Sequence, residues 1–158
     1  MKPNVTYKFG SEYASGGAGG ISTVDDYIKF LEALRVGDII LKKESILLMA
    51  TNQLSEYQSR TYTSSNTHGY GLGVRCPHKD VRYSDFGWAG AASAFCAVDC
   101  KNEISLYFGT HMFWSPVHEL ITMLYRFARA ELIDDTEFDG VYRDLEQLHN
   151  YNKIKGEM

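Results

Sequence analysis

The sequence predicts an α+β fold, in which a long C-terminal helix packs against an antiparallel sheet of three to five strands and shorter helices lie on the N-terminal side. Three observations predict this class. Residues 23–36 carry apolar side chains at helical spacing. Strand-like segments then follow one another between residues 69 and 110, with connections too short for a helical crossover, so neighbouring strands must run antiparallel. Residues 115–132 form another helical pattern, and one apolar helix face can cover one face of a sheet.

The first helix is expected over 23–36. Ser22 and Thr23 are both residue types that cap helix N-termini, and two aspartates follow in the first turn, where the helix dipole favours acidic groups. Gly37 provides the stop. The apolar face of this helix consists of Val24, Tyr27, Ile28, Leu31 and Leu34.

A second, shorter helix is expected over 43–52. Its start is weakly capped, because Lys42 and Lys43 stand where an oxygen-bearing side chain is preferred. Residues 53–68 are rich in Ser, Thr, Asn and Gln, and we expect them to form an exposed loop.

Strands are expected in the middle of the chain. The first is interrupted by glycines, and a turn at residues 77–80 separates it from the second. The last two form a hairpin closed by residues 99–103. The expected strands are 69–76, 81–88, 95–98 and 104–110.

The C-terminal helix is expected to begin at Ser115, a cap residue that is followed by proline at the first helical position, and to reach residue 132. Residues 131–146 then carry seven acidic side chains against one arginine. We therefore expect one domain over 1–133, followed over 134–158 by an acidic tail or a weak extra helix.

The composition excludes several classes of protein. A chain of 158 residues has the length of one domain, and 44% hydrophobic with 23% charged residues indicates a folded protein rather than a disordered one. A net charge of −4 gives no sign of the basic face that nucleic acids require. No apolar run approaches the ~20 residues of a membrane span. We expect neither a nucleic-acid partner nor a membrane partner.

The cysteines indicate the compartment. Residues 1–7 contain no apolar stretch typical of a secretory signal. Cys76, Cys96 and Cys100 make an odd number of thiols, which without such a signal favours the reduced state. The sequence therefore predicts a cytoplasmic location.

Motifs for metal, phosphate or nucleophilic chemistry are weak. The glycine run at 16–20 lacks both the preceding strand and the following Lys-Ser/Thr of a phosphate loop, so a tight turn is the better interpretation. The cysteines and histidines lack zinc-site spacing, and zinc content would test a metal-binding interpretation. Gly-x-Ser-x-Gly, Ser-x-x-Lys, Ser-Asp-Asn and Tyr-x-Asn are all absent. We expect no metal, no cofactor and no catalytic nucleophile in this chain.

Residues 86–95, Phe-Gly-Trp-Ala-Gly-Ala-Ala-Ser-Ala-Phe, place small side chains directly after an aromatic strand end. Such a segment permits either tight strand packing or the close approach of a ligand. The residue types of this segment, taken by themselves, favour tight strand packing.

Residues 86–95 and several earlier segments together resemble a known family. Residues 13–27 contain Ser-Gly-Gly-Ala-Gly-Gly-Ile-Ser-Thr-Val-Asp-Asp-Tyr, residues 70–74 read Tyr-Gly-Leu-Gly-Val, and Met49 lies between them. Together with Gly-Trp-Ala-Gly at 87–90, they resemble the C-terminal part of the serine beta-lactamase-like hydrolases. That family includes class C beta-lactamases, penicillin-binding proteins, D-aminopeptidases and family VIII esterases. The resemblance covers about residues 13–130 and implies a partial beta-lactamase/transpeptidase-like fold.

The resemblance also implies a site. Trp88-Ala89-Gly90 is similar to the Trp-x-Gly form of a strand motif beside the active site, as in the esterase branch. Trp88 would then line the substrate cleft, and Gly90 would let the strand approach an acyl group. Ala91 would offer its backbone N–H to the oxyanion, a type of donor that contributes roughly 3–4 kcal/mol.

The family's nucleophile and base lie in Ser-x-x-Lys and Tyr-x-Asn, upstream of the matching region. The resemblance therefore implies a fragment of a serine hydrolase, inactive alone, whose parent acts on an ester, amide or beta-lactam through an acyl-serine. It would be a truncated product, a separately encoded half or an excised domain. The alternative is a non-catalytic binding or assembly module that reuses the half-fold. In either case we expect a homo-oligomer, or a partner polypeptide that supplies the N-terminal half.

Overall fold

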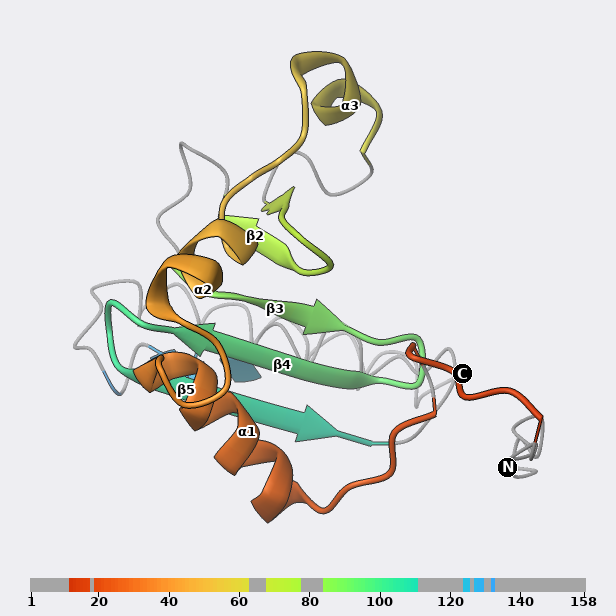
Figure 1. Cartoon of the computed structure of the whole chain (residues 1–158), viewed down its shortest axis with the longest axis vertical. Helices are drawn as coiled ribbons and strands as arrows, with labels where there is room; N and C mark the ends of the chain where they lie inside the picture. The colour runs from red at the N-terminus through yellow and green to blue at the C-terminus, as the bar shows by residue number, and fades with distance from the viewer. Residues whose placement is uncertain are drawn as a thin grey trace, which may run out of the picture. The chain divides into compact units, whose positions relative to one another are not determined.

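The computed structural model describes residues 12–17, 19–62, 68–77, 84–110, 124, 125, 127–129 and 132. The chain divides into two units, Met1–Phe113 and Trp114–Met158, and each is described by itself. In the described part of the first unit, three helices precede five strands (Figure 1). The α+β class with an antiparallel sheet is confirmed.

The first predicted helix is confirmed as α1, Val24–Val36. The Oγ1 of Thr23 accepts a hydrogen bond from the Asp26 N–H at 3.2 Å, so Thr23 is the N-cap. At the other end the Gly37 N–H donates to the Ala33 carbonyl, and Gly37 has φ 75°, a conformation that glycine adopts without strain.

The second predicted helix is present but shorter, as α2, Lys43–Met49. Its N-cap, Lys42, makes no side-chain capping bond, as the sequence predicts. The helix ends at Ala50, and the Thr51 hydroxyl then donates to the Leu47 carbonyl at 2.7 Å.

The prediction of a loop over 53–68 is wrong for its central residues, which form α3, Glu56–Thr61. A capping box starts this helix. The Gln58 N–H donates to the Ser55 hydroxyl at 3.2 Å, and the Ser55 N–H donates to the Gln58 side-chain oxygen at 2.9 Å. The helix buries no residue, so no apolar pattern reveals it, whereas the Ser-x-x-Gln signal does.

The prediction of one strand over 69–76 is also wrong. The segment is a hairpin of β1, His68–Tyr70, and β2, Arg75–Pro77, in which Gly69 pairs with Cys76. Gly73, with φ 80°, lies in the turn. A strand pattern interrupted by glycines is therefore two strands with a tight turn between them.

The sheet has the order β1-β2-β3-β4-β5 and is antiparallel throughout. The predicted hairpin of the last two strands is confirmed. The side chain of Asp99 stabilises its turn by accepting from the N–H groups of Lys101 and Asn102, each at 3.0 Å. The three remaining strands are β3, Phe86–Ala89; β4, Ala94–Asp99; and β5, Ile104–Gly109.

Three strand boundaries differ from prediction. Of the strand predicted over 81–88, residues 86–88 belong to β3, residues 84 and 85 precede it, and residues 81–83 lie outside the described residues. The strand predicted over 104–110 ends one residue earlier, at Gly109. The short strand predicted over 95–98 extends by one residue at each end in β4.

The core lies between α1, α2 and one face of the sheet. Helix α1 contacts β4 and β5, and Figure 1 shows it crossing the sheet at β5. Tyr27 of α1 stacks on Tyr107 of β5 with ring centroids 4.8 Å apart. Burial of these apolar groups stabilises the fold by roughly 25 cal/mol per Å². The buried members of the core are Leu31, Leu34, Ile46, Cys76, Phe86 and Val98.

Little of the helix predicted over 115–132 falls in the described part of the second unit. Residues 124, 125, 127–129 and 132 are helical, and the rest of the predicted helix lies outside the described residues. The predicted boundary between residues 133 and 134 also lies outside them. Among the helices that the structure describes, none has the length and apolar character to cross a membrane.

Candidate functional site

The predicted site residues occupy the end of β3 and the turn that follows it. Trp88 pairs across the sheet with Cys96 of β4, and β2 flanks β3 on its other side. Although its backbone is held within the sheet, Trp88 keeps 44% of its surface exposed. The strand thus fixes a large aromatic side chain that remains accessible to a ligand.

Two tyrosines extend this aromatic surface. Tyr70 of β1 packs edge-to-face on Trp88, with centroids 5.7 Å apart and an interplanar angle of 80°. Tyr62, which ends α3, packs on Tyr70 in the same manner at 5.8 Å and 63°. Each such pair is worth about 0.5–1.5 kcal/mol beyond its buried area. We call Tyr62, Tyr70 and Trp88 the aromatic row.

The turn after β3 is tightly hydrogen-bonded. The Gly90 N–H donates to the Ala94 carbonyl at 2.7 Å, and the Ser93 N–H donates to the Gly90 carbonyl at 3.0 Å. Directly after β5, the Thr110 N–H donates to the Ser93 carbonyl at 3.1 Å. Ala91 lies exposed in this turn, and within the residues that the structure describes its N–H donates no hydrogen bond. A rigid turn therefore presents an accessible backbone donor.

Gly87 and Gly90 differ in whether the fold leaves room for a side chain. At Gly87 a Cβ would collide with the Cys96 carbonyl, so close packing of β3 on β4 requires glycine. At Gly90 the nearest atom to such a Cβ is the Ala94 carbonyl oxygen at 3.6 Å, an ordinary contact. The fold therefore tolerates a methyl group at position 90.

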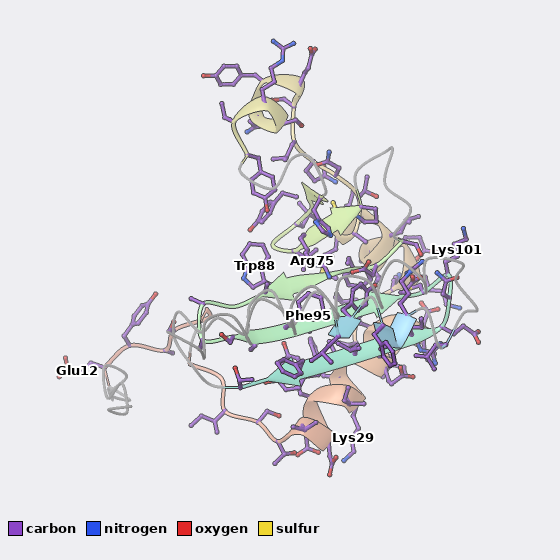
Figure 2. The ribbon with its side chains drawn as sticks, turned by 180° about the vertical axis from the view of Figure 1, so that it is seen from behind. Glu12, Lys29, Arg75, Trp88, Phe95 and Lys101 are labelled. Atoms are coloured by element: carbon purple, nitrogen blue, oxygen red, sulfur yellow. The ribbon has the colours of Figure 1, made fainter. Side chains whose placement is uncertain are left out.

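A buried ion pair joins β2 to the residue that precedes β3. Arg75 Nη2 and Asp85 Oδ2 are 2.6 Å apart, and their side chains are 10% and 0% exposed. The guanidinium also lies 5.0 Å from the Phe95 ring centre (Figure 2). Gly87, the cross-strand partner of Arg75, adds no side chain beside it. Sequence reasoning misses this pair, because a separation of ten residues carries no local signal.

The ion pair is incompletely hydrogen-bonded. Arg75 Nη1 and Asp85 Oδ1 are buried and have no hydrogen-bond partner within the described part of the chain. The charges of Arg75 and Asp85 both act on the pKa of His68 of β1. Burial, and secondarily the charge of Arg75, lower the pKa of His68, and Asp85 opposes them. The neutral imidazole is therefore favoured beside the pair.

The three cysteines are free thiols. Burial raises the pKa of Cys76, Cys96 and Cys100, so the unreactive protonated form is favoured at each position. None of them has the environment of a nucleophilic cysteine. In the described residues, no group of three or more His, Cys, Asp or Glu side chains could hold a metal ion.

Comparison with protein-family models and with curated proteins finds no match to this chain. The family resemblance therefore remains a proposal that depends on the residues themselves. Of the predicted site, Trp88, Ala89, Gly90 and Ala91 lie together because they are contiguous at one strand end. Tyr70 and Tyr62 join them only through the β1–β2 hairpin and α3, the two elements that sequence reasoning misassigned.

Proposed function

We propose that this chain is the C-terminal portion of a beta-lactamase-like serine hydrolase and supplies one wall of its substrate site. The observation that carries the proposal is the end of β3. There an accessible Trp88 is followed by Gly90, where the fold tolerates a methyl group but the sequence has none, and by Ala91, whose N–H donates no hydrogen bond to any residue that the structure describes. Close packing of β3 on β4 explains why position 87 is glycine. We attribute the glycine at position 90 to the close approach of a ligand.

The reaction would be acyl transfer to a serine followed by hydrolysis. In it the Ala91 N–H would donate to the oxyanion of the tetrahedral intermediate, and Trp88 would pack against the acyl or leaving group. The sequence contains neither Ser-x-x-Lys nor Tyr-x-Asn, so the nucleophile and base must come from another segment. An oxyanion donor without a nucleophile gives little rate, and the chain alone should be inactive.

The open edge of the sheet supports a missing half. Within the described residues, β5 pairs only with β4, so no described strand covers its other edge, and such an edge can pair with another chain. In the proposed parent enzyme, N-terminal strands would complete the sheet at this edge. The same contribution could come from a separate polypeptide.

Among an ester, an amide and a beta-lactam as substrate, we favour the ester over the beta-lactam. Trp88 carries no charge, so it offers no cationic partner to the carboxylate that beta-lactams bear. The aromatic row extends the apolar wall beside it. The free cysteines support a reducing, cytoplasmic location for the protein.

Activity assays test the proposal in two steps. The purified chain should not turn over p-nitrophenyl butyrate or a chromogenic cephalosporin above background. Co-expression with the N-terminal half of a family VIII esterase, which carries Ser-x-x-Lys and Tyr-x-Asn, should give ester hydrolysis. Gly90→Val should abolish that activity, and Ile21→Ser, an exposed position elsewhere, should not. A saturable rate from the chain alone would contradict the proposal, and so would a complemented rate that Gly90→Val leaves intact.

The alternative is a non-catalytic binding or assembly module. Several large aliphatic side chains are exposed around the connection between α1 and α2, outside the proposed substrate wall. The DNA immediately upstream separates the two functions. An open frame with both missing motifs favours the hydrolase portion, and a promoter with a ribosome site favours the module.

A further inference from the structure

The β1–β2 hairpin shares few backbone pairs with the rest of the sheet. Strands β2 and β3 have one aligned residue pair, Arg75 with Gly87, whereas β3 and β4 have four. On its outer edge, β1 is bonded to the segment after α2. The Gln53 N–H donates to the Tyr70 carbonyl at 2.8 Å, and the Tyr70 N–H donates to Asn52 Oδ1 at 3.1 Å. Among the described strands, the boundary between β2 and β3 has the fewest aligned pairs.

The Arg75 side chain joins the hairpin to the sheet across this boundary. Because Gly87 adds no side chain beside it, the guanidinium reaches over β3 and lies 5.0 Å from the ring centre of Phe95 on β4 (Figure 2). It also forms the 2.6 Å ion pair with Asp85, directly before β3. Both contacts depend on one buried cation. The attachment of the hairpin to β3 and β4 therefore depends on the charge balance around Arg75.

His68 lies on the same face of the hairpin as Arg75. In the register of β1 with β2, His68 is opposite Pro77, and Tyr70 is opposite Arg75. Since successive side chains alternate between the two faces of a strand, all four of these residues share one face. His68 and Arg75 are diagonal neighbours on it, a relation in which long side chains interact.

Two charged groups among the described residues act on His68. Burial is the largest cause that lowers the pKa of His68, the charge of Arg75 lowers it further, and the charge of Asp85 opposes both. Asn52 and Gln53, which border the outer edge of β1, are neutral. A proton on His68 therefore adds a second positive charge beside the buried guanidinium.

We propose that His68 makes the attachment of the β1–β2 hairpin sensitive to acid. Protonation of the imidazole places a like charge beside Arg75, competes for the Asp85 carboxylate and so loosens the hairpin from β3. Tyr70 belongs to this hairpin and Trp88 to β3, so acidification moves Tyr70 away from Trp88 and exposes the indole further. The switch acts on the aromatic row, but it does not rest on the hydrolase function, because the contact between the two rings exists in this chain alone.

The direction of the effect follows from the lowered pKa of His68. In the loosened hairpin the imidazole titrates near its ordinary pKa of 6.5, whereas in the attached hairpin it binds the same proton more weakly. The attachment is therefore fully present above pH 6.5 and weakens as the pH falls below that value. A single proton changes the equilibrium constant for loosening by at most ~10-fold per pH unit.

Fluorescence of the full chain tests the switch. The sequence has two tryptophans, so Trp114→Phe leaves Trp88 as the single fluorescent indole. Between about pH 7.5 and about pH 5.5 the emission of Trp88 should shift to longer wavelength, and its quenching by acrylamide, a neutral probe, should increase. His68→Gln, which stays neutral throughout this range, should abolish both changes. His149→Gln, the same substitution at a histidine of the second unit, is the matched control and should leave them intact.

Far-UV circular dichroism, recorded over the same range, separates a local change from general acid unfolding. The spectrum should stay constant while the Trp88 signal changes. Constant Trp88 fluorescence would overturn the proposal, as would a response that His68→Gln retains or a loss of the whole circular dichroism signal in step with it. If His68→Gln does not fold, wild type alone still decides through the comparison of the two signals. None of these outcomes touches the hydrolase proposal, which is judged by the activity of the complemented chain.

Discussion

Asp85→Ala should strongly destabilise the protein. The substitution removes the carboxylate that faces Arg75 at 2.6 Å and leaves a guanidinium that is 10% exposed without its counter-charge. Breaking a buried pair in this way costs about 3–5 kcal/mol, because the remaining charge stays desolvated. The Phe95 ring, 5.0 Å from the guanidinium, does not offset this loss, because the same contact is already present in the wild type. Since a domain has a free energy of unfolding of only about 5–15 kcal/mol, the substitution removes a large part of it.

The same reasoning predicts that removing both charges is far less harmful. Arg75→Met combined with Asp85→Leu replaces the pair with apolar groups and removes Arg75 Nη1 and Asp85 Oδ1, two buried atoms that have no hydrogen-bond partner within the described residues. Such replacements are often neutral or stabilising. We expect the double variant to recover most of the stability that Asp85→Ala loses.

Urea unfolding followed by far-UV circular dichroism measures these differences at neutral pH. The surface pair of Lys29 and Asp26, whose side chains are 75% and 63% exposed, provides the matched control. Asp26→Ala also perturbs the first turn of α1, so Lys29→Ala is the better substitution, and it should cost less than ~1 kcal/mol. If Asp85→Ala costs no more than Lys29→Ala, or if the double variant is less stable than Asp85→Ala, the electrostatic argument is refuted.

Three further predictions concern backbone packing, capping and pH. Gly87→Ala should lower the urea midpoint because its Cβ meets the Cys96 carbonyl, whereas Gly90→Ala should leave the midpoint unchanged; equal effects would contradict the packing argument. Ser55→Ala should cost about 1 kcal/mol locally by removing the α3 cap, seen as faster amide exchange confined to that helix. Burial raises the pKa of Tyr27 from its usual 10.0 to about 12, so the folded state holds this proton more tightly than the unfolded state. Stability should therefore fall as pH rises from 10 to 12, and the fall should be smaller in Tyr27→Phe if this assignment is correct.

Local signals account for the elements that sequence reasoning predicted well. The limits of α1 follow from Thr23 and Gly37, which act within one turn of the helix ends. The hairpin of β4 and β5 follows from a short turn that Asp99 caps. In contrast, α3 has no apolar face and is visible only through its Ser55–Gln58 cap.

The candidate site likewise contains residues that a local sequence signal reveals and residues that no local signal reveals. Trp88 and Ala91 could be located from the sequence because they belong to one short segment. Tyr70 reaches Trp88 only because the glycine-interrupted segment turns back on itself. The contact of Arg75 with Asp85 depends on the register between β2 and β3, which no local pattern encodes.

The unequal pairing along the sheet gives it two regions of different cooperativity. Strands β4 and β5 share six aligned residue pairs, whereas β2 and β3 share one, Arg75 with Gly87. We therefore expect the amides of β4 and β5 to exchange slowly with solvent deuterium, and those of the β1–β2 hairpin to exchange earlier as a separate foldon. The aromatic row crosses this seam between Tyr70 and Trp88. Partial unfolding at the seam would therefore part the two rings while most of the sheet stayed intact, so the proposed substrate wall could widen without global unfolding.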